Sequence, residues 1–209
     1  MLTAEMPSSA PVWLASRSPR RRQMLAQAGA SVCVRPAEID DGSLTPGCVR
    51  PIHWAMALAY LKARCVADSL RLEQGAAASG TVLAADTICV HRGCILGQPA
   101  DADEARAMLI RMRGDTHETI TGVCVLSLSD RRRWILADRA FVHYGPVSDA
   151  AIDSYLESGQ WRGKAGAYNL RERVEAGWPV WCDGDPATVM GLPLKRLEPW
   201  LARLRKAAP

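Results

Sequence analysis

The sequence predicts a protein of the α/β class, because strand-like and helix-like segments alternate along its 209 residues. An apolar run at residues 12–15 leads directly into a helical pattern. A second helical pattern, at residues 51–67, precedes an apolar stretch at residues 81–90 that is typical of a buried strand. Since 48% of the residues are hydrophobic, a chain of this length can bury a sizeable core.

The first elements are a strand, a tight loop and a helix in immediate succession. Ser18 is a favourable N-cap, and Pro19 suits the first helical position. Met24 and Leu25 then recur at helical spacing until Gly29, where a left-handed residue can end the helix. This start therefore predicts a short buried strand at residues 12–15 that is followed closely by a helix.

The loop between this strand and helix carries groups that bind anions. The hydroxyls of Ser16 and Ser18, the guanidinium groups of Arg20 and Arg21, and the N–H groups at the helix start could converge on one polyphosphate. The loop lacks the glycines and the lysine of a Walker loop or a dinucleotide-binding loop. By itself, the run of arginines is equally consistent with the solvated face of a surface helix.

An acidic stretch follows the next expected strand, which covers residues 31–34. Glu38, Asp40 and Asp41 place three carboxylates within four positions. Such a stretch is usually an acidic turn. It is also a candidate site for the divalent cation that accompanies a polyphosphate, because hard cations prefer carboxylate oxygens.

Residues 51–67 predict an amphipathic helix that carries a lysine at the edge of its apolar face. The apolar positions recur every three or four residues: Trp54, Leu58, Leu61 and Cys65. Lys62 is either an ordinary lysine that extends along apolar surface toward water, or a cation that leans over the phosphate site. Residues 73–80, rich in Ala, Gly and Ser, predict a loop.

The strand predicted at residues 81–90 contains a polar pair, Asp86 and Thr87, in an otherwise apolar sequence. A carboxylate buried without a partner costs several kcal/mol. Asp86 must therefore be solvated by a cleft, paired with a cation or bound to a metal, which makes it the strongest single candidate for a functional residue. The alternative is a structural aspartate that pairs with an arginine inside the sheet.

The second half of the chain continues the alternation of strands and helices. The expected elements are a hairpin over residues 91–97, a helix from Asp101 to the stop at Gly114, paired strands at 119–128 and 134–144, a helix begun by Ser148, a strand at 178–181, and a last helix. In the last helix we expect Leu197, Leu201 and Leu204 to be buried and Pro199 to break or restart the helix. His117 has no second imidazole at ligand spacing, so we expect it to be structural.

One glycine-containing stretch of this half is a candidate for ligand contact. In residues 161–168, Gly163 and Gly166 let the backbone approach a ligand closely, and Lys164 supplies a positive charge.

The composition narrows the class of protein. A net charge of +4 suits an enzyme with an anionic substrate, but it is too small to indicate a nucleic-acid partner. No stretch has the apolar length that crosses a bilayer, so we expect a soluble, intracellular protein. The seven cysteines are odd in number and lack CxxC spacing, which predicts reduced thiols that pack in the interior.

Five motifs, in order and spacing, resemble the Maf family from about residue 12 to residue 204. They are Leu14–Arg21, Ala85–Thr87, Leu96–Pro99, Lys164–Tyr168 and Gly191–Leu194. Maf proteins are nucleoside triphosphate pyrophosphatases, once called septum formation inhibitors. They release pyrophosphate from a nucleotide with a divalent cation, Mg²⁺ or Mn²⁺.

The resemblance implies a cytoplasmic, house-cleaning enzyme that forms a homodimer. It also implies one domain over residues 12–205. We expect residues 1–11 and 206–209 to be loose ends, as chain termini commonly are. The implied fold is a long bent mixed sheet flanked by helices around a nucleotide cleft, similar to that of inosine triphosphate pyrophosphatases.

The resemblance also assigns roles to single residues. Asp86 falls on the catalytic aspartate, which accepts a proton, and Asp41 and Asp86 would hold the cation. The residues that would contact the substrate are Ser16, Ser18, Arg20, Arg21, Lys62, Thr87, Gln98, Lys164 and Arg171. Arg20 and Thr87 fall on positions linked to base selection, and an arginine at position 20 resembles the branch that acts on dTTP and UTP.

Two single positions and one stretch of four residues depart from the family's pattern. Asp41 stands where glutamate is usual, and Gln98 stands where lysine is usual. Residues 169–172 replace Gly-Ile-Gln-Gly, so that Arg171 stands where a specificity glutamine is expected.

Two alternatives to hydrolysis therefore stay open: a Maf-like regulator with weak catalysis, and a basic module that binds nucleic acid. The second is disfavoured, because Phe141 is the only phenylalanine and no basic stripe is interleaved with aromatic residues.

Overall fold

The structure is a computed structural model that describes residues 10–207. Its centre is a seven-stranded sheet with the order β2-β1-β3-β5-β6-β7, and β4 pairs with β3 beside this path. The strands are β1 (Val12–Leu14), β2 (Cys33–Val34), β3 (Thr81–His91), β4 (Cys94–Leu96), β5 (Asp115–Ser127), β6 (Arg133–Tyr144) and β7 (Val180–Asp183). β1 runs parallel to β2 and β3, and the other pairs are antiparallel. The sheet is therefore mixed, and the α/β class predicted from the sequence is confirmed.

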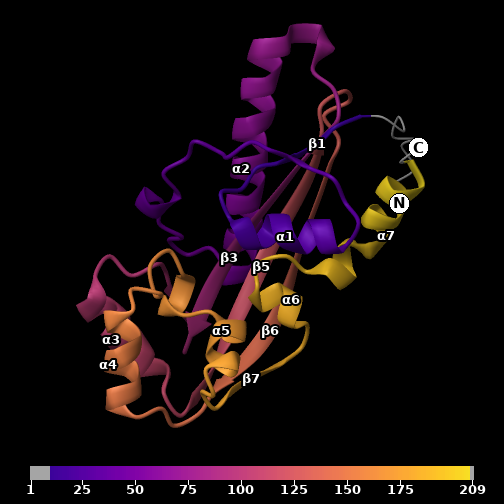
Figure 1. Cartoon of the computed structure of the whole chain (residues 1–209). Helices are drawn as coiled ribbons and strands as arrows, with labels where there is room; N and C mark the ends of the chain where they lie inside the picture. Colours follow the sequence, from indigo (N-terminus) through magenta and orange to yellow (C-terminus); the bar gives the residue numbers. More distant parts are fainter. Residues whose placement is uncertain (1–9, 208–209) are drawn as a thin grey trace.

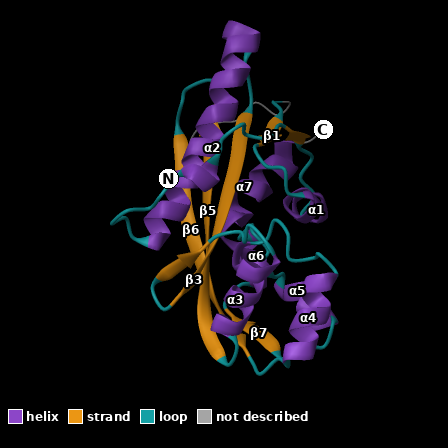
Figure 2. Cartoon of the chain, turned by 90° about the vertical axis from the view of Figure 1, so that its left-hand side faces the viewer, coloured by secondary structure: helices purple, strands orange, loops and turns teal. Residues whose placement is uncertain are grey.

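Helices cover both faces of this sheet (Figure 1). Within the described residues they are α1 (Pro19–Gln27), α2 (Pro51–Gln74), α3 (Ala102–Met112), α4 (Asp149–Glu157), α5 (Leu170–Glu175), α6 (Pro186–Val189) and α7 (Leu194–Ala207), with 3-10 turns η1 (Asp41–Ser43), η2 (Gly75–Ala77) and η3 (Ala165–Ala167). Figure 2 shows α2 on one side of the sheet and α1, α6 and α7 on the other.

The alternating side chains of β3 explain why α2 packs on one face of the sheet and α1 and α7 on the other, because successive residues of a strand point to opposite faces. Val82 and Ala84 pack with the buried residues of α2. Leu83 and Ala85 pack with residues of α1 and α7 on the other face. Asp86 and Thr87 are the next two residues of β3, so their side chains also point to opposite faces of the sheet.

Helix α2 differs from its prediction in length and in the face that it buries. It continues to Gln74, so the loop expected from residue 73 begins later, with η2. Leu61 is 40% exposed, and Trp54 and Cys65 are only partly buried. The residues that meet the sheet are mainly small ones spaced four apart, and each is fully buried: Ala55, Ala59, Ala63 and Ala67. The predicted apolar face was therefore largely wrong.

A glycine of β5 explains why small residues face the sheet. A Cβ placed at Gly122 would lie 2.2 Å from the carbonyl oxygen of Ala55. The start of α2 thus rests directly on the backbone of β5, and only alanine fits along the line of closest approach. Gly122 pairs with Asp86 of β3, so this contact also sets the height of α2 above the aspartate.

Helix α7 contains Pro199 without interruption, contrary to the predicted break. Pro199 is the sixth residue of the helix, so its missing N–H removes one bond of the second turn. Leu197, Trp200 and Leu201 are buried around it, and their burial offsets that loss. Leu204 is only partly buried, whereas the sequence pattern predicted burial.

The remaining differences are small, except for the cysteines. The strand expected at residues 31–34 covers only Cys33–Val34, and the strand expected at 178–181 is shifted to Val180–Asp183. All seven cysteines are free thiols, as predicted. Cys89 and Cys124 are buried, Cys65 and Cys182 are partly buried, and Cys182 packs against a core cluster. The prediction that the cysteines pack in the interior was wrong for the exposed Cys33, Cys48 and Cys94.

The first described residues lie against the sheet. Pro11 is already tied to the sheet, because its carbonyl oxygen accepts from the Thr81 N–H at 3.0 Å. Most of the terminal segments predicted to be loose, residues 1–9 and 208–209, lie outside the described part of the chain.

Candidate functional site

A cleft of about 1510 Å³ lies beside the middle of β3. All the candidate residues except Asp41 line it: Ser16, Ser18, Arg20, Arg21, Lys62, Asp86, Thr87, Gln98, Lys164 and Arg171. Basic side chains outnumber acidic ones in the lining. Asp41 begins η1, but its side chain lies outside the described part of the structure.

The pairing of β3 explains the position of the cleft. β1 pairs with residues 81–83 of β3, and β4 pairs with residues 89–91 on the same edge. In the described pairing, residues 84–88 meet a strand only on the β5 side. The chain leaves β1 through Ala15, whose N–H donates to the Leu83 carbonyl at 2.8 Å, and so the loop at Ser16–Ser18 arrives at this open edge.

The two serines of the loop shape the start of α1. The Ser18 hydroxyl caps the helix by accepting from the Arg21 N–H at 3.4 Å. The Ser16 hydroxyl accepts from the Ser18 N–H and from Arg21 Nη1, both at 3.2 Å. The N–H of Arg21 is thus satisfied within the chain, contrary to the expectation of free N–H groups there. Each hydroxyl still carries a hydrogen that can be donated to an anion.

Arg21 is held by a chain of hydroxyl groups that runs over one face of the sheet, from β3 to β5. Its Nε donates to the Gly191 carbonyl at 2.7 Å, and its Nη2 donates to Thr87 Oγ1 at 3.0 Å. Thr87 Oγ1 lies 2.8 Å from Thr121 Oγ1, which donates to the Thr188 carbonyl at 2.7 Å. A carbonyl only accepts, so the single hydrogen of Thr121 is used there, and Thr87 must donate to Thr121. The hydroxyl of Thr87 therefore orients Arg21.

Asp86 and Lys62 form an ion pair on the α2 side of the cleft. Lys62 Nζ lies 2.5 Å from Asp86 Oδ1. Asp86 is 7% exposed and lines the cleft. Two of the solutions expected for a buried aspartate are thus combined, a cleft and a cationic partner. The partner is a lysine of α2 rather than an arginine of the sheet.

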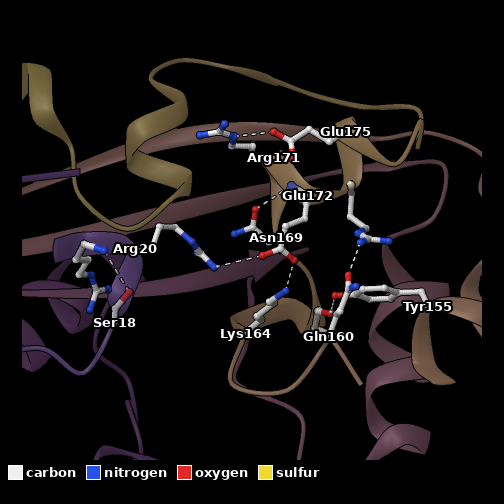
Figure 3. A network of polar contacts seen from close by, with 12 residues as sticks. Ser18, Arg20, Tyr155, Gln160, Lys164, Asn169, Arg171, Glu172 and Glu175 are labelled. Carbon is white, nitrogen blue, oxygen red and sulfur yellow. Dashed lines mark hydrogen bonds and ion pairs between the residues drawn. The ribbon is translucent and has the colours of Figure 1, made fainter. Parts of the chain in front are cut away.

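A third group of charges joins the two walls of the cleft (Figure 3). Lys164, in the segment before η3, pairs with Glu172 Oε2, and Arg20 Nη2 of α1 lies 4.0 Å from Glu172 Oε1. Burial lowers the pKa of Arg20, and the charge of Glu172 partly opposes this shift. Arg171, the sequence candidate, instead pairs with Glu175 at 2.8 Å, and both side chains are exposed.

His117 is buried and lines the cleft. Its Nε2 lies 2.8 Å from the Tyr168 hydroxyl. Burial, the largest cause, lowers the pKa of His117 to about 4, so the ring is neutral at physiological pH. This environment is consistent with the structural role that the sequence predicted.

The described residues do not form a metal cage. Among them, no group of three or more His, Cys, Asp or Glu side chains is placed to hold a metal ion. Mg²⁺ commonly binds through one or two carboxylates and the phosphates of a substrate, and it keeps several waters. The carboxylate of Asp86 in the cleft fits this second kind of site.

Sequence reasoning missed three parts of this site: Glu172, Gly122 and the pair of Thr121 and Thr188. The residues from Asn169 to Glu172 have the spacing of an N-cap and its third helical residue, and the Asn169 side chain does accept from the Glu172 N–H at 3.1 Å. That signal predicts a helix start, but it does not show which charges the carboxylate meets. Gly122, Thr121 and Thr188 act through contacts with segments distant in the sequence, so they carry no local signal.

Known proteins match the chain over most of its length. The family described as Maf-like protein matches residues 11–204. A dTTP/UTP pyrophosphatase of Ruminiclostridium cellulolyticum is 36% identical over 92% of this chain and 95% of its own length. The dTTP/UTP pyrophosphatase of Salinibacter ruber is 38% identical over 90% of this chain and 88% of its own, and that of an Anaeromyxobacter species is 38% identical over 94% and 90%.

The fold and the cleft define an α/β protein with a predominantly basic cleft at the open edge of a mixed sheet. The chain belongs to the Maf family, as its five motifs predicted.

Proposed function

We propose that this protein hydrolyses a nucleoside triphosphate to the nucleoside monophosphate and pyrophosphate, as a house-cleaning nucleotide pyrophosphatase. One observation carries the proposal: a buried aspartate opens onto the same cleft as a loop rich in serine and arginine. The relatives named dTTP/UTP pyrophosphatase support uracil or thymine nucleotides as the substrates.

In the proposed reaction, water attacks the α-phosphorus and the bond to the bridging oxygen of the β-phosphate breaks. Asp86 orients the water and accepts its proton. Ser16, Ser18 and Arg21 bind phosphate oxygens, and Lys62 stabilises the negative charge that builds on the departing pyrophosphate. Pyrophosphate leaves without a covalent intermediate on the protein.

A divalent cation, Mg²⁺ or Mn²⁺, belongs to the proposal as the cofactor. Asp86 and Asp41 would hold it together with the substrate, and when bound it supplies charge neutralisation of the phosphates.

The hydroxyl chain behind Arg21 gives a prediction. Thr121→Val removes the acceptor of the Thr87 hydrogen, so the Thr87 oxygen that accepts from Arg21 is no longer fixed and Arg21 is oriented less firmly, through Ser16 and Gly191. We expect kcat/KM for the best triphosphate to fall about tenfold, while Thr121→Ser stays close to wild type because it keeps the hydroxyl. Steady-state kinetics of the two variants, with thermal unfolding to confirm that both are folded, measures this. Equal kcat/KM values for Thr121→Val and Thr121→Ser would contradict the role of the Thr121 hydroxyl in orienting Arg21.

The activity itself is tested by pyrophosphate release. Purified protein is assayed with a panel of nucleoside triphosphates, with Mg²⁺ and with Mn²⁺, and we expect release from dTTP and UTP. If the folded protein released pyrophosphate from no triphosphate, this would favour the alternative of a Maf-like regulator with weak catalysis. Salt-dependent binding to oligonucleotides without hydrolysis would favour the nucleic-acid module.

The finer predictions of the sequence stay part of this proposal: a bent sheet similar to that of inosine triphosphate pyrophosphatases, one domain over residues 12–205, a homodimer and a cytoplasmic location. Within residues 10–207, no helix has the length and apolarity needed to span a membrane.

A further inference from the structure

Glu172 occupies a position in the cleft that the phosphate-binding interpretation does not explain. It is the third residue of α5, and its side chain is 39% exposed. Its carboxylate lies between Lys164 on one wall and Arg20 on the other (Figure 3). The Asn169 cap fixes the backbone at this point, since Asn169 Oδ1 accepts from the Glu172 N–H.

The Glu172 carboxylate restricts which part of a nucleotide can bind next to it. Ionised glutamate only accepts hydrogen bonds, and the oxygens of a triphosphate are also acceptors that carry negative charge. A phosphate group would therefore be repelled by Glu172. The hydrogen-bond donors of a nucleoside triphosphate are on its base and its ribose, so this end of the cleft suits the nucleoside.

The three side chains offer donors and an acceptor in alternation. Lys164 donates, Glu172 accepts and Arg20 donates. The pairing edge of uracil and thymine has the complementary order: a carbonyl oxygen, the N3–H and a second carbonyl oxygen. Cytosine instead presents an unprotonated N3 and an amino group, which would set acceptor against acceptor and donor against donor.

We propose that Glu172 is a specificity-determining residue that accepts the N3–H of a uracil or thymine base, while Lys164 and Arg20 donate to the two flanking carbonyl oxygens. This inference rests on the proposed function, because it takes a nucleotide as the ligand. The family resemblance already links the position of Arg20 to base selection, and the proposal adds Glu172 as the acceptor and places Lys164 at the base.

The test compares UTP with CTP, which share ribose and phosphates and differ only in the base edge. Glu172→Gln can turn its amide to offer either a carbonyl or an N–H. We expect wild type to prefer UTP, and the ratio of kcat/KM values for UTP and CTP to fall at least about tenfold in Glu172→Gln. Glu157→Gln removes the same charge from an exposed position of α4 outside the cleft, and its ratio stays at the wild-type value.

A binding measurement separates this inference from the proposed reaction. The affinities of wild type and Glu172→Gln for UMP and CMP are measured by calorimetry, where no turnover is needed. A preference for UMP that depends on Glu172 supports the inference even if no triphosphate is hydrolysed, a result that would reject only the proposed reaction. An equal change for uracil and cytosine nucleotides in Glu172→Gln, or no preference in wild type, would overturn it.

Discussion

Asp86→Asn is expected to reduce pyrophosphate release by a factor on the order of a thousand or more while nucleotide binding persists. Asparagine keeps the size of the side chain but cannot accept the proton of the attacking water, and general-base catalysis contributes roughly 10²- to 10⁴-fold. Binding persists because Lys62 and the loop of Ser16 and Ser18 are unchanged. Single-turnover rates and calorimetric titration of a slow or non-hydrolysable nucleotide measure the two effects separately.

A matched control for this variant is Asp183→Asn. Asp183 is an exposed aspartate of β7 that pairs with His143 at 2.7 Å, outside the cleft. We expect its turnover to equal that of wild type. If a folded Asp86→Asn protein kept its turnover, or if it lost nucleotide binding along with turnover, Asp86 would not be the proton acceptor.

Gly122→Ala is expected to have the largest effect on stability. The new Cβ would lie 2.2 Å from the Ala55 carbonyl oxygen and 2.6 Å from the Met56 nitrogen. These are backbone atoms of α2 that cannot rotate away, so the helix must shift. We expect a loss of about 3 kcal/mol or more in the free energy of unfolding, which corresponds to a fall of ~6–12 °C in Tm.

The shift of α2 should also reduce activity, because the same helix positions Lys62 against Asp86. The control is Gly97→Ala, where a Cβ meets no atom within 4 Å. Its Tm should change by less than ~2 °C, since surface substitutions are usually within about 0.5 kcal/mol. If thermal unfolding gave Gly122→Ala the same Tm as Gly97→Ala, the close contact between α2 and β5 would not support the fold.

Local signals in the sequence predicted most helix starts correctly. Ser18, Asp101 and Ser148 each accept a hydrogen bond from a backbone N–H of the first helical turn, as their N-cap positions predicted. Such a contact joins residues three positions apart, so the sequence alone specifies it. The sequence alone also identified Asp86 and Thr87 as candidates, because two polar residues within an apolar strand need solvent or polar partners wherever the strand lies in the fold.

Long-range packing decided which face of α2 is buried and that α7 continues through Pro199, and the sequence pattern misjudged both. Apolar periodicity placed Leu61 on the buried face, but Gly122 brings the helix so close that alanines take that position. Pro199 should break α7, but burial of Leu197 and Leu201 against the sheet keeps it continuous. Periodicity cannot show how closely an element approaches its neighbour, because that distance depends on the other surface.

By itself, the sequence determined the α/β class, the family and the chemical types of the groups in the site. The tertiary structure decided which groups meet. It placed Arg20 and Lys164 against Glu172, and it connected Arg21 through Thr87 to Thr121. The physical reason is that side-chain chemistry and helix caps depend on a few neighbouring residues, whereas these contacts depend on strand order and on the open edge of β3, which form only when the whole chain folds.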